Sequence, residues 1–241
     1  MLKIDDIKSI DSHNMIGVYD RWPQIASDNF STDFSKIDIK NIDHIVFAGM
    51  GGSGTIGDVF ASILSKTDLH VSVVKGYLLP KTVDDNTLVV STSISGNTLE
   101  TISILKNVEK LNAKFVAVFS GGLMEKFCKD KNIKSYKISE EHSPRASFLG
   151  FLYSTLSILE QIIPVKKTDI NKSIQSLFNL QRIISSENLN ETNEALQIAQ
   201  WIKEIPMVYY PSGLQSTAIR FKNSMQENAK SHVMTEDVIE A

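Results

Sequence analysis

Cysteine is almost absent from this sequence. Cys128 is the only one among 241 residues, so neither an intrachain disulfide nor a cysteine-rich zinc site can form. We interpret it as a small apolar residue on a helix. No apolar run approaches the roughly 20 residues that a bilayer requires. The N-terminal segment MLKIDDIKSIDSHNM lacks the basic start and continuous apolar core of a signal peptide. These absences predict a cytoplasmic protein with no membrane partner.

An excess of positive charge is also missing. Lys and Arg total 25 against 28 Asp and Glu, a formal net charge of −3, and no dense basic run occurs. Nucleic acid is therefore not an expected partner, because its phosphates would meet no positive field. The composition, 42% hydrophobic and 22% charged, is that of a globular protein. At roughly 150 residues per domain, the length predicts one to two domains.

Short β-rich runs alternate with helical spacing in the first half of the chain. Helical patterns follow three of them, at Thr55 to Ser65, Asn97 to Leu111 and Gly122 to Asp130. Helices of this length are the crossovers that parallel strands need, and near-continuous apolar strands indicate a sheet covered on both faces. The pattern predicts an α/β fold with a doubly wound, mostly parallel five-stranded sheet flanked by helices. The predicted strands are His44 to Ala48, Leu69 to Val74, Thr87 to Ser91, Lys114 to Phe119 and, more weakly, Ile133 to Ile138.

The remaining segments suggest four parts. Residues 1–40, with apolar positions three or four apart, predict one or two amphipathic helices. Residues 41–165 form the first lobe, including a buried helix over 146–163, and 166–204 form a helical connector with surface helices. Residues 205–241 open a second α/β lobe, with a strand at Pro206 to Tyr210 and a helix from Leu214 to Lys230. The eleven residues that follow are too few to complete it.

A glycine-rich segment, Gly49-Met50-Gly51-Gly52-Ser53-Gly54, follows the first predicted strand. Glycines allow a ligand to approach the backbone closely, and a helix N-terminus attracts an anion. A dinucleotide site would need an acidic residue at the end of the second strand, which instead ends Val73-Val74-Lys75-Gly76. The segment does not match a P-loop, because no Gly-Lys-Ser/Thr sequence ends it. Two interpretations of the segment remain open: a phosphate-binding turn, and a tight turn that binds no ligand.

A cluster of hydroxyl side chains follows the third predicted strand. Ser93, Ser95 and Thr98 surround Gly96 at the expected start of a helix. Hydroxyls, backbone N–H groups and the helix dipole can bind a phosphate monoester without lysine. One such residue is expected to cap the helix, but five Ser and Thr residues between positions 91 and 98 exceed that need. We expect a phosphate site.

These motifs resemble those of the sugar isomerase (SIS) fold. The resemblance extends to the bifunctional phosphoglucose/phosphomannose isomerases through Ser143-Pro144-Arg145, YYPSGLQSTAIRFK and Gln226-Glu227-Asn228-Ala229-Lys230. It covers roughly residues 41 to 241. It implies interconversion of glucose 6-phosphate or mannose 6-phosphate with fructose 6-phosphate through an enediol or enediolate, with no metal and no nucleotide cofactor, in a homodimer.

The resemblance also implies roles for individual residues. Glu227 would be the proton-transferring base and Arg145 the cation that stabilises the enediolate. The implied substrate-binding residues are Gly51, Gly52, Ser53, Ser93, Ser95 and Thr98. The histidine that the family uses for ring opening would fall just past Ala241, and we assign that role to none of the five histidines present. We therefore expect a C-terminally incomplete chain, for which a non-catalytic sugar-phosphate sensor on the same fold is the alternative.

Overall fold

The computed structural model describes residues 2–108 and 110–240, and its centre is the expected parallel sheet. The strand order is β2-β1-β3-β4-β5, and every pairing is parallel. The first and fourth strands occupy the predicted residues. The second begins one residue late, the third continues to Ser93 and the fifth is shorter than expected. The strands are β1 His44–Ala48, β2 His70–Val74, β3 Thr87–Ser93, β4 Lys114–Phe119 and β5 Ser135–Lys137.

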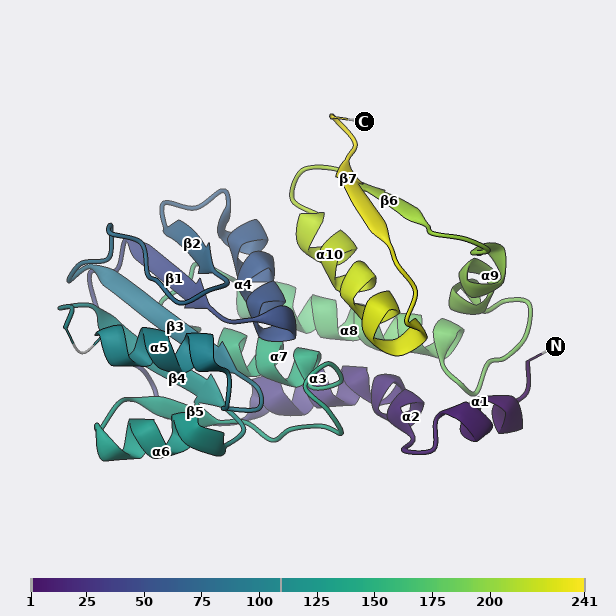
Figure 1. Cartoon of the computed structure of the whole chain (residues 1–241), viewed down its shortest axis with the longest axis horizontal. Coiled ribbons are helices and arrows are strands. Elements are labelled where there is room, and N and C mark those ends of the chain that lie inside the picture. Colours follow the sequence, from purple (N-terminus) through teal and green to yellow (C-terminus); the bar gives the residue numbers. More distant parts are fainter. Residues whose placement is uncertain (1, 109, 241) are drawn as a thin grey trace.

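Both faces of the sheet are covered, as Figure 1 shows. On one face, Ile45 and Phe47 pack in a cluster with α4 (Gly51–Leu64) and α7 (Phe148–Ile158). On the other face, Val46 and Ala48 meet Ile104 of α5 (Leu99–Val108), while α6 (Gly122–Asp130) supplies Met124 and Cys128. Alternating side chains of a strand point to opposite faces. The continuous apolar strands therefore fill two cores, which confirms the doubly wound prediction.

The N-terminal segment forms three helices rather than the one or two predicted. They are α1 (Ile4–Ile10), α2 (Met15–Asp20) and α3 (Trp22–Ser31). Asn14 has a left-handed backbone with φ 55°, and the carboxylate of Asp11 accepts hydrogen bonds from the first amides of α2. These local bonds favour a break between α1 and α2 over a continuous helix. Helix α3 packs along α7.

Three helices follow the sheet. The predicted buried helix is α7, which is shorter than 146–163 because turns occupy residues 159–162. The surface helices are α8 (Lys167–Ile184) and α9 (Glu194–Trp201). The helix predicted over Asn97 to Leu111 is α5, which begins at Leu99. The last part of that prediction includes residue 109, which lies outside the described residues. In the described part of the chain, no helix combines the length and the apolar character needed to cross a membrane.

The C-terminal region contains a strand that the sequence did not predict. The expected strand is β6 (Met207–Tyr210), and α10 (Gln215–Ser224) runs into a π-helical turn, η1 (Met225–Ala229). The additional strand, β7 (Met234–Asp237), pairs in parallel with β6, starting from Met207 opposite Met234. Helix α10 also packs on α4, so this unit lies against the first lobe (Figure 1).

Candidate active site

The glycine-rich segment and the hydroxyl cluster lie at the point where the strand order reverses. β1 pairs with both β2 and β3, and the chain leaves β1 toward one edge of the sheet and β3 toward the other. Ligands of open α/β sheets bind outside the carboxyl ends of the strands at such a point. Both motifs directly follow these ends, after Ala48 and after Ser93.

The glycine-rich segment is the first turn of α4 rather than a turn before it. The helix begins at Gly51, not at Thr55 as predicted, and Gly51 has φ +52°. A Cβ atom on Gly49 would lie 2.8 Å from the carbonyl of Ser53, so this glycine permits close packing. A Cβ on Gly51 or Gly52 would meet nothing within 4 Å. These two glycines therefore leave the helix N-terminus open to a ligand.

The hydroxyl cluster forms a bonded loop. The Oγ atoms of Ser93 and Thr98 share a hydrogen bond of 3.0 Å, and the Gly96 amide donates to Ser93 Oγ at 3.1 Å. Ser53 Oγ, from the glycine-rich segment, accepts a 3.4 Å hydrogen bond from the Ile94 amide. That bond brings the two motifs together, and the predicted binding residues Gly51, Gly52, Ser53, Ser93, Ser95 and Thr98 all belong to these two segments.

Asn97 caps a neighbouring helix instead of its own. Its Oδ1 accepts from the Leu123 amide at 3.0 Å, at the start of α6, and the Met124 amide donates to the Gly96 carbonyl at 2.9 Å. Gly96 has φ +68°, and a Cβ there would lie 1.7 Å from the Gly121 carbonyl oxygen. The loop is therefore packed against the α6 N-terminus, and only glycine fits at its centre.

Arg145 and Glu227 meet in a separate pocket of about 430 Å³. Arg145 Nε donates to Asn228 Oδ1 at 2.7 Å, and Asn228 Nδ2 donates to Tyr19 Oη at 3.1 Å. The lining residues are Ile7, Ile10, Asp11, Met15, Ile16, Tyr19, Arg145, Glu227, Asn228 and Lys230. No residue of the glycine-rich segment or of the hydroxyl cluster lines this pocket. The predicted site residues therefore form two separate groups in the structure.

A short path of contacts connects the two groups. Asn223, one helical turn before Glu227, donates through Nδ2 to Thr55 Oγ1 at 3.5 Å. Thr55 Oγ1 in turn donates to the Gly51 carbonyl at 3.1 Å, in the first turn of α4. Helix α10, which leads to Glu227, therefore packs on α4, the helix that begins in the glycine-rich segment.

Glu227 lies on the π-helical turn η1. This turn follows α10 directly and ends at Lys230, whose backbone is left-handed with φ 54°. Single π turns inside helices are rare and frequent at functional sites. Lys230 Nζ donates to the Glu227 carbonyl at 2.7 Å rather than to its carboxylate. The half-buried carboxyl group lines the pocket with Arg145.

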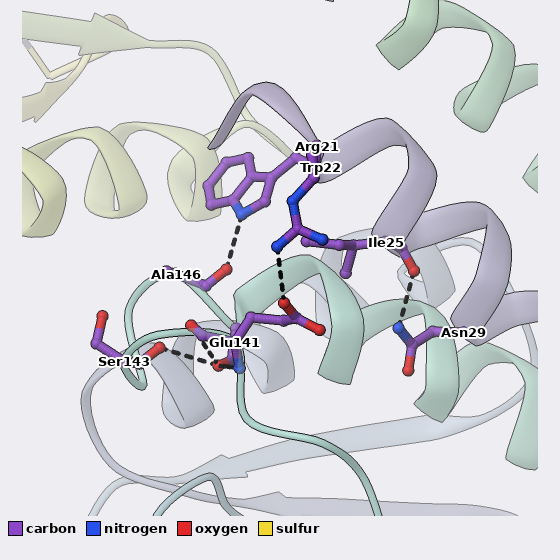
Figure 2. A network of polar contacts seen from close by, with 8 residues as sticks. Arg21, Trp22, Ile25, Asn29, Glu141, Ser143 and Ala146 are labelled. Atoms are coloured by element: carbon purple, nitrogen blue, oxygen red, sulfur yellow. Dashed lines mark hydrogen bonds and ion pairs between the residues drawn. The ribbon is translucent and has the colours of Figure 1, made fainter. Parts of the chain in front are cut away.

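The loop that carries Arg145 is tied to the N-terminal helices, as Figure 2 shows. Trp22 Nε1 donates to the Ala146 carbonyl at 2.7 Å, and Arg21 pairs with Glu141 at 3.3 Å. Ser147 Oγ accepts from the Glu141 amide at 2.8 Å. Sequence reasoning did not anticipate that residues 1–40 contribute Tyr19 and Trp22 to the site. Apolar spacing indicated helices there and nothing about their partners.

Burial raises the pKa of Asp11, but the amides of Ile16 and Met15 outweigh it and lower that pKa overall. Two histidines, His142 and His13, also act electrostatically on Asp11 in the pocket lining and help to lower its pKa. None of the five histidines, all within the described chain, lines the Arg145 pocket. His44 lies at the amino end of β1, where burial, followed by His70, lowers its pKa. We find no cluster of three or more His, Cys, Asp or Glu side chains suited to a metal ion in the described residues.

Solved structures share the fold at low sequence identity. The C-terminal domain of glucosamine-fructose-6-phosphate aminotransferase from Francisella tularensis superposes with a TM-score of 0.66 at 17% identity, covering 92% of this chain and 69% of that one. Tagatose-6-phosphate ketose/aldose isomerase from Escherichia coli gives a TM-score of 0.62 at 17% identity, over 92% and 65% of the two chains. At such identity these matches show the fold alone.

Curated relatives are more similar in sequence. The bifunctional phosphoglucose/phosphomannose isomerase of Caldicellulosiruptor bescii is 32% identical over 81% of this chain and 59% of its own. That of Thermoplasma acidophilum is 34% identical over 78% and 56%. A D-glucosamine-6-phosphate 4-epimerase of Sulfolobus acidocaldarius is 29% identical over 90% and 66%. The chain thus spans less than two thirds of the length of these relatives.

Two family profiles match the sequence. The profile described as the SIS domain matches residues 38–163, which is more than half of the chain. The profile described as the bacterial phospho-glucose isomerase C-terminal SIS domain matches residues 191–241. The chain therefore belongs to the SIS domain family, where its homologues include several bifunctional phosphoglucose/phosphomannose isomerases.

Proposed function

We propose that this chain carries the phosphate-binding loops and two catalytic residues of an aldose–ketose isomerase. Its substrates would be glucose 6-phosphate or mannose 6-phosphate, interconverted with fructose 6-phosphate. The observation that carries the proposal is the path from Glu227 through Asn223 and Thr55 to the first turn of α4. Helix α10, which leads to Glu227, packs on α4, at whose N-terminus the phosphate would bind.

The phosphate would bind at the strand-order reversal. Ser93, Ser95 and Thr98 supply hydroxyl donors, and the open N-terminus of α4 supplies amides and a positive dipole end at Gly51 and Gly52. Ser53 acts in the same place by joining the two loops. Because the loops are bonded to each other before any ligand arrives, little ordering would be needed on binding.

Proton transfer would take place between C1 and C2 of the open-chain sugar. The Glu227 carboxylate takes the C2 proton of the aldose and returns it to C1, while a hydroxyl proton moves from O2 to O1. Arg145 is suited to the negative charge that develops on the enediolate oxygens, since a guanidinium is permanently charged and offers planar donors. The Arg145 side chain is already oriented by Asn228 in this pocket.

We extend the proposal to the organisation of the protein. Residues 1–40, 41–165, 166–204 and 205–241 would be a helical segment, the first SIS lobe, a helical connector and the start of a second lobe. The family profiles over 38–163 and 191–241 support the two lobes. A cytoplasmic homodimer is expected from the family resemblance.

A coupled isomerase assay with Glu227→Gln tests the function. We expect the full-length protein to turn over glucose 6-phosphate or mannose 6-phosphate and its Glu227→Gln variant to lose this activity, with Glu204→Gln as an exposed glutamate control. The 241-residue chain alone would be inactive if the ring-opening histidine is missing. Full turnover by Glu227→Gln would show that the proposed base is wrong. Glucosamine 6-phosphate belongs in the assay because one relative is a 4-epimerase.

A sugar-phosphate sensor is the second candidate function. Calorimetric titration with fructose 6-phosphate separates it from the isomerase, because a sensor binds the ligand without converting it. Binding lost in Ser93→Ala, together with no turnover by the wild type, would favour the sensor. Tight binding and turnover together would exclude it.

A further inference from the structure

We propose that Arg220 is a positioning residue of this site, because it holds the Arg145 backbone in place. The inference rests on the proposed function for its effect on turnover. Its effect on the Arg145 loop itself can be measured without any enzyme activity.

Arg220 bridges the C-terminal helix and the loop that carries Arg145. From α10, its Nη2 atom donates a 2.7 Å hydrogen bond to the Arg145 carbonyl. The adjacent carbonyl, that of Ala146, accepts from Trp22 Nε1 at 2.7 Å (Figure 2). Two successive carbonyls are therefore held by side chains from two elements distant in sequence, which fixes the backbone from which the Arg145 side chain extends.

Aromatic rings surround the same guanidinium. Its central carbon lies 4.7 Å from the centroid of the Phe148 ring and 5.9 Å from that of Trp22. These distances are within the range of cation–π attraction. The rings hold the guanidinium at the base of the site and exclude water from it.

The charge of Arg220 is only partly compensated. Its Nε and Nη1 atoms are buried and have no hydrogen-bond partner among the described residues. A buried cation without a hydrogen-bonded anion is costly, so such an arrangement calls for an explanation. Burial lowers the pKa of Arg220, and attraction to Tyr19 and Glu227 opposes that effect.

Two other cations lie at the Arg145 pocket, whereas Arg220 is not among its lining residues. Arg145 donates from Nε to Asn228, and Lys230 bonds the Glu227 carbonyl. Arg220 differs from both because it bonds the backbone of the Arg145 loop. Its charge and its planar hydrogen-bonding geometry can be separated by substitution.

Three variants test the proposal. Arg220→Gln removes the charge, Arg220→Lys keeps the charge but loses the planar fork, and Arg182→Gln removes an exposed arginine of α8 as the matched control. Circular dichroism and thermal melting establish that each variant is folded. The Arg145 loop is monitored through the ¹⁵N–¹H resonance of the Trp22 indole, which bonds the adjacent Ala146 carbonyl and is identified by comparison with Trp201→Phe.

In Arg220→Lys we expect kcat to fall about tenfold with little change in KM, because the Arg145 loop is no longer fixed. Solvent exchange of the Trp22 indole proton should become about tenfold faster in the same variant. Arg220→Gln should show both effects, and Arg182→Gln should show neither.

Two results would overturn the inference. Wild-type kcat in folded Arg220→Lys contradicts the positioning role, and so does wild-type exchange of the Trp22 indole proton in that variant. If Arg220→Gln does not fold, Arg220→Lys decides the question alone. If the full-length protein shows no turnover, the proposed function fails, while the NMR measurement still decides whether Arg220 fixes the Arg145 loop.

Discussion

Substituting Gly96 with alanine should disrupt the loop between Ser93 and Thr98, because the added Cβ has no room. It would lie 1.7 Å from the Gly121 carbonyl oxygen, an atom of the backbone that cannot rotate away. The residue also has φ +68°, which costs an L-amino acid about 1–2 kcal/mol. Relieving the overlap requires the loop and the α6 N-terminus to separate.

The cost follows from the bonds that this separation breaks. The amide of Met124 bonds the Gly96 carbonyl at 2.9 Å, and that of Leu123 bonds Asn97 Oδ1 at 3.0 Å. At about 1 kcal/mol for each hydrogen bond, together with the backbone strain, the expected destabilisation is about 3–4 kcal/mol. For a protein of this size, 1 kcal/mol lowers Tm by about 2–4 °C, so Gly96→Ala should melt roughly 10 °C below the wild type.

Two measurements test this prediction. Thermal unfolding followed by circular dichroism gives the change in Tm, and calorimetric titration with fructose 6-phosphate gives the loss of binding. Gly76→Ala is the matched control, since a Cβ there meets nothing within 4 Å. We expect that control to unfold within about 2 °C of the wild type and to bind normally. If Gly96→Ala did the same on both counts, the packing of this loop and its role in phosphate binding would be refuted.

Three further predictions concern separate parts of the molecule. Ser93→Ala should weaken fructose 6-phosphate binding about tenfold in calorimetry, since it removes a donor and the partner of the Gly96 amide; unchanged affinity would remove Ser93 from the site. Cys128 should react with a thiol reagent only after unfolding, because burial raises its pKa to about 11; fast labelling of the native protein would contradict its place in the core. The folded-state pKa of His44 is lowered, first by burial and then by His70. The unfolded chain therefore binds more protons as pH falls through about 6.5. Stability to urea should fall over that range, and less so in His44→Gln; equal slopes would show that His44 is not responsible.

The sheet was predictable because its signal is local. Strands buried on both faces are nearly continuous apolar runs, and HIVFA and KFVAVF occupy the predicted residues in the structure. β7 escaped prediction because MTED is half charged and becomes a strand only by pairing with β6. The start of α4 was wrong by four residues, since consecutive glycines resemble a loop in sequence but form the first helical turn here.

Local patterns suggested the two loops of the candidate site, and the family resemblance suggested Arg145 and Glu227, but neither indicated the geometry. Serine and glycine motifs at strand ends are short-range patterns, and parallel strands place their carboxyl ends at one edge. Arg220 and Tyr19 carry no such pattern. Their role depends on contacts across the fold, such as the bond from Arg220 to the Arg145 carbonyl, 75 positions away in sequence.

The amino-acid sequence alone determined the α/β architecture and singled out the glycine-rich segment and the hydroxyl cluster, because apolar periodicity and glycine or hydroxyl clusters act over a few residues. Arg145 and Glu227 became a candidate pair only through the family resemblance. Only the folded chain decided that Glu227 sits on a π-helical turn beside Arg145, and that the N-terminal helices support the Arg145 loop. These arrangements arise from packing between segments far apart in the chain, where burial and pairing of charges depend on which surfaces meet.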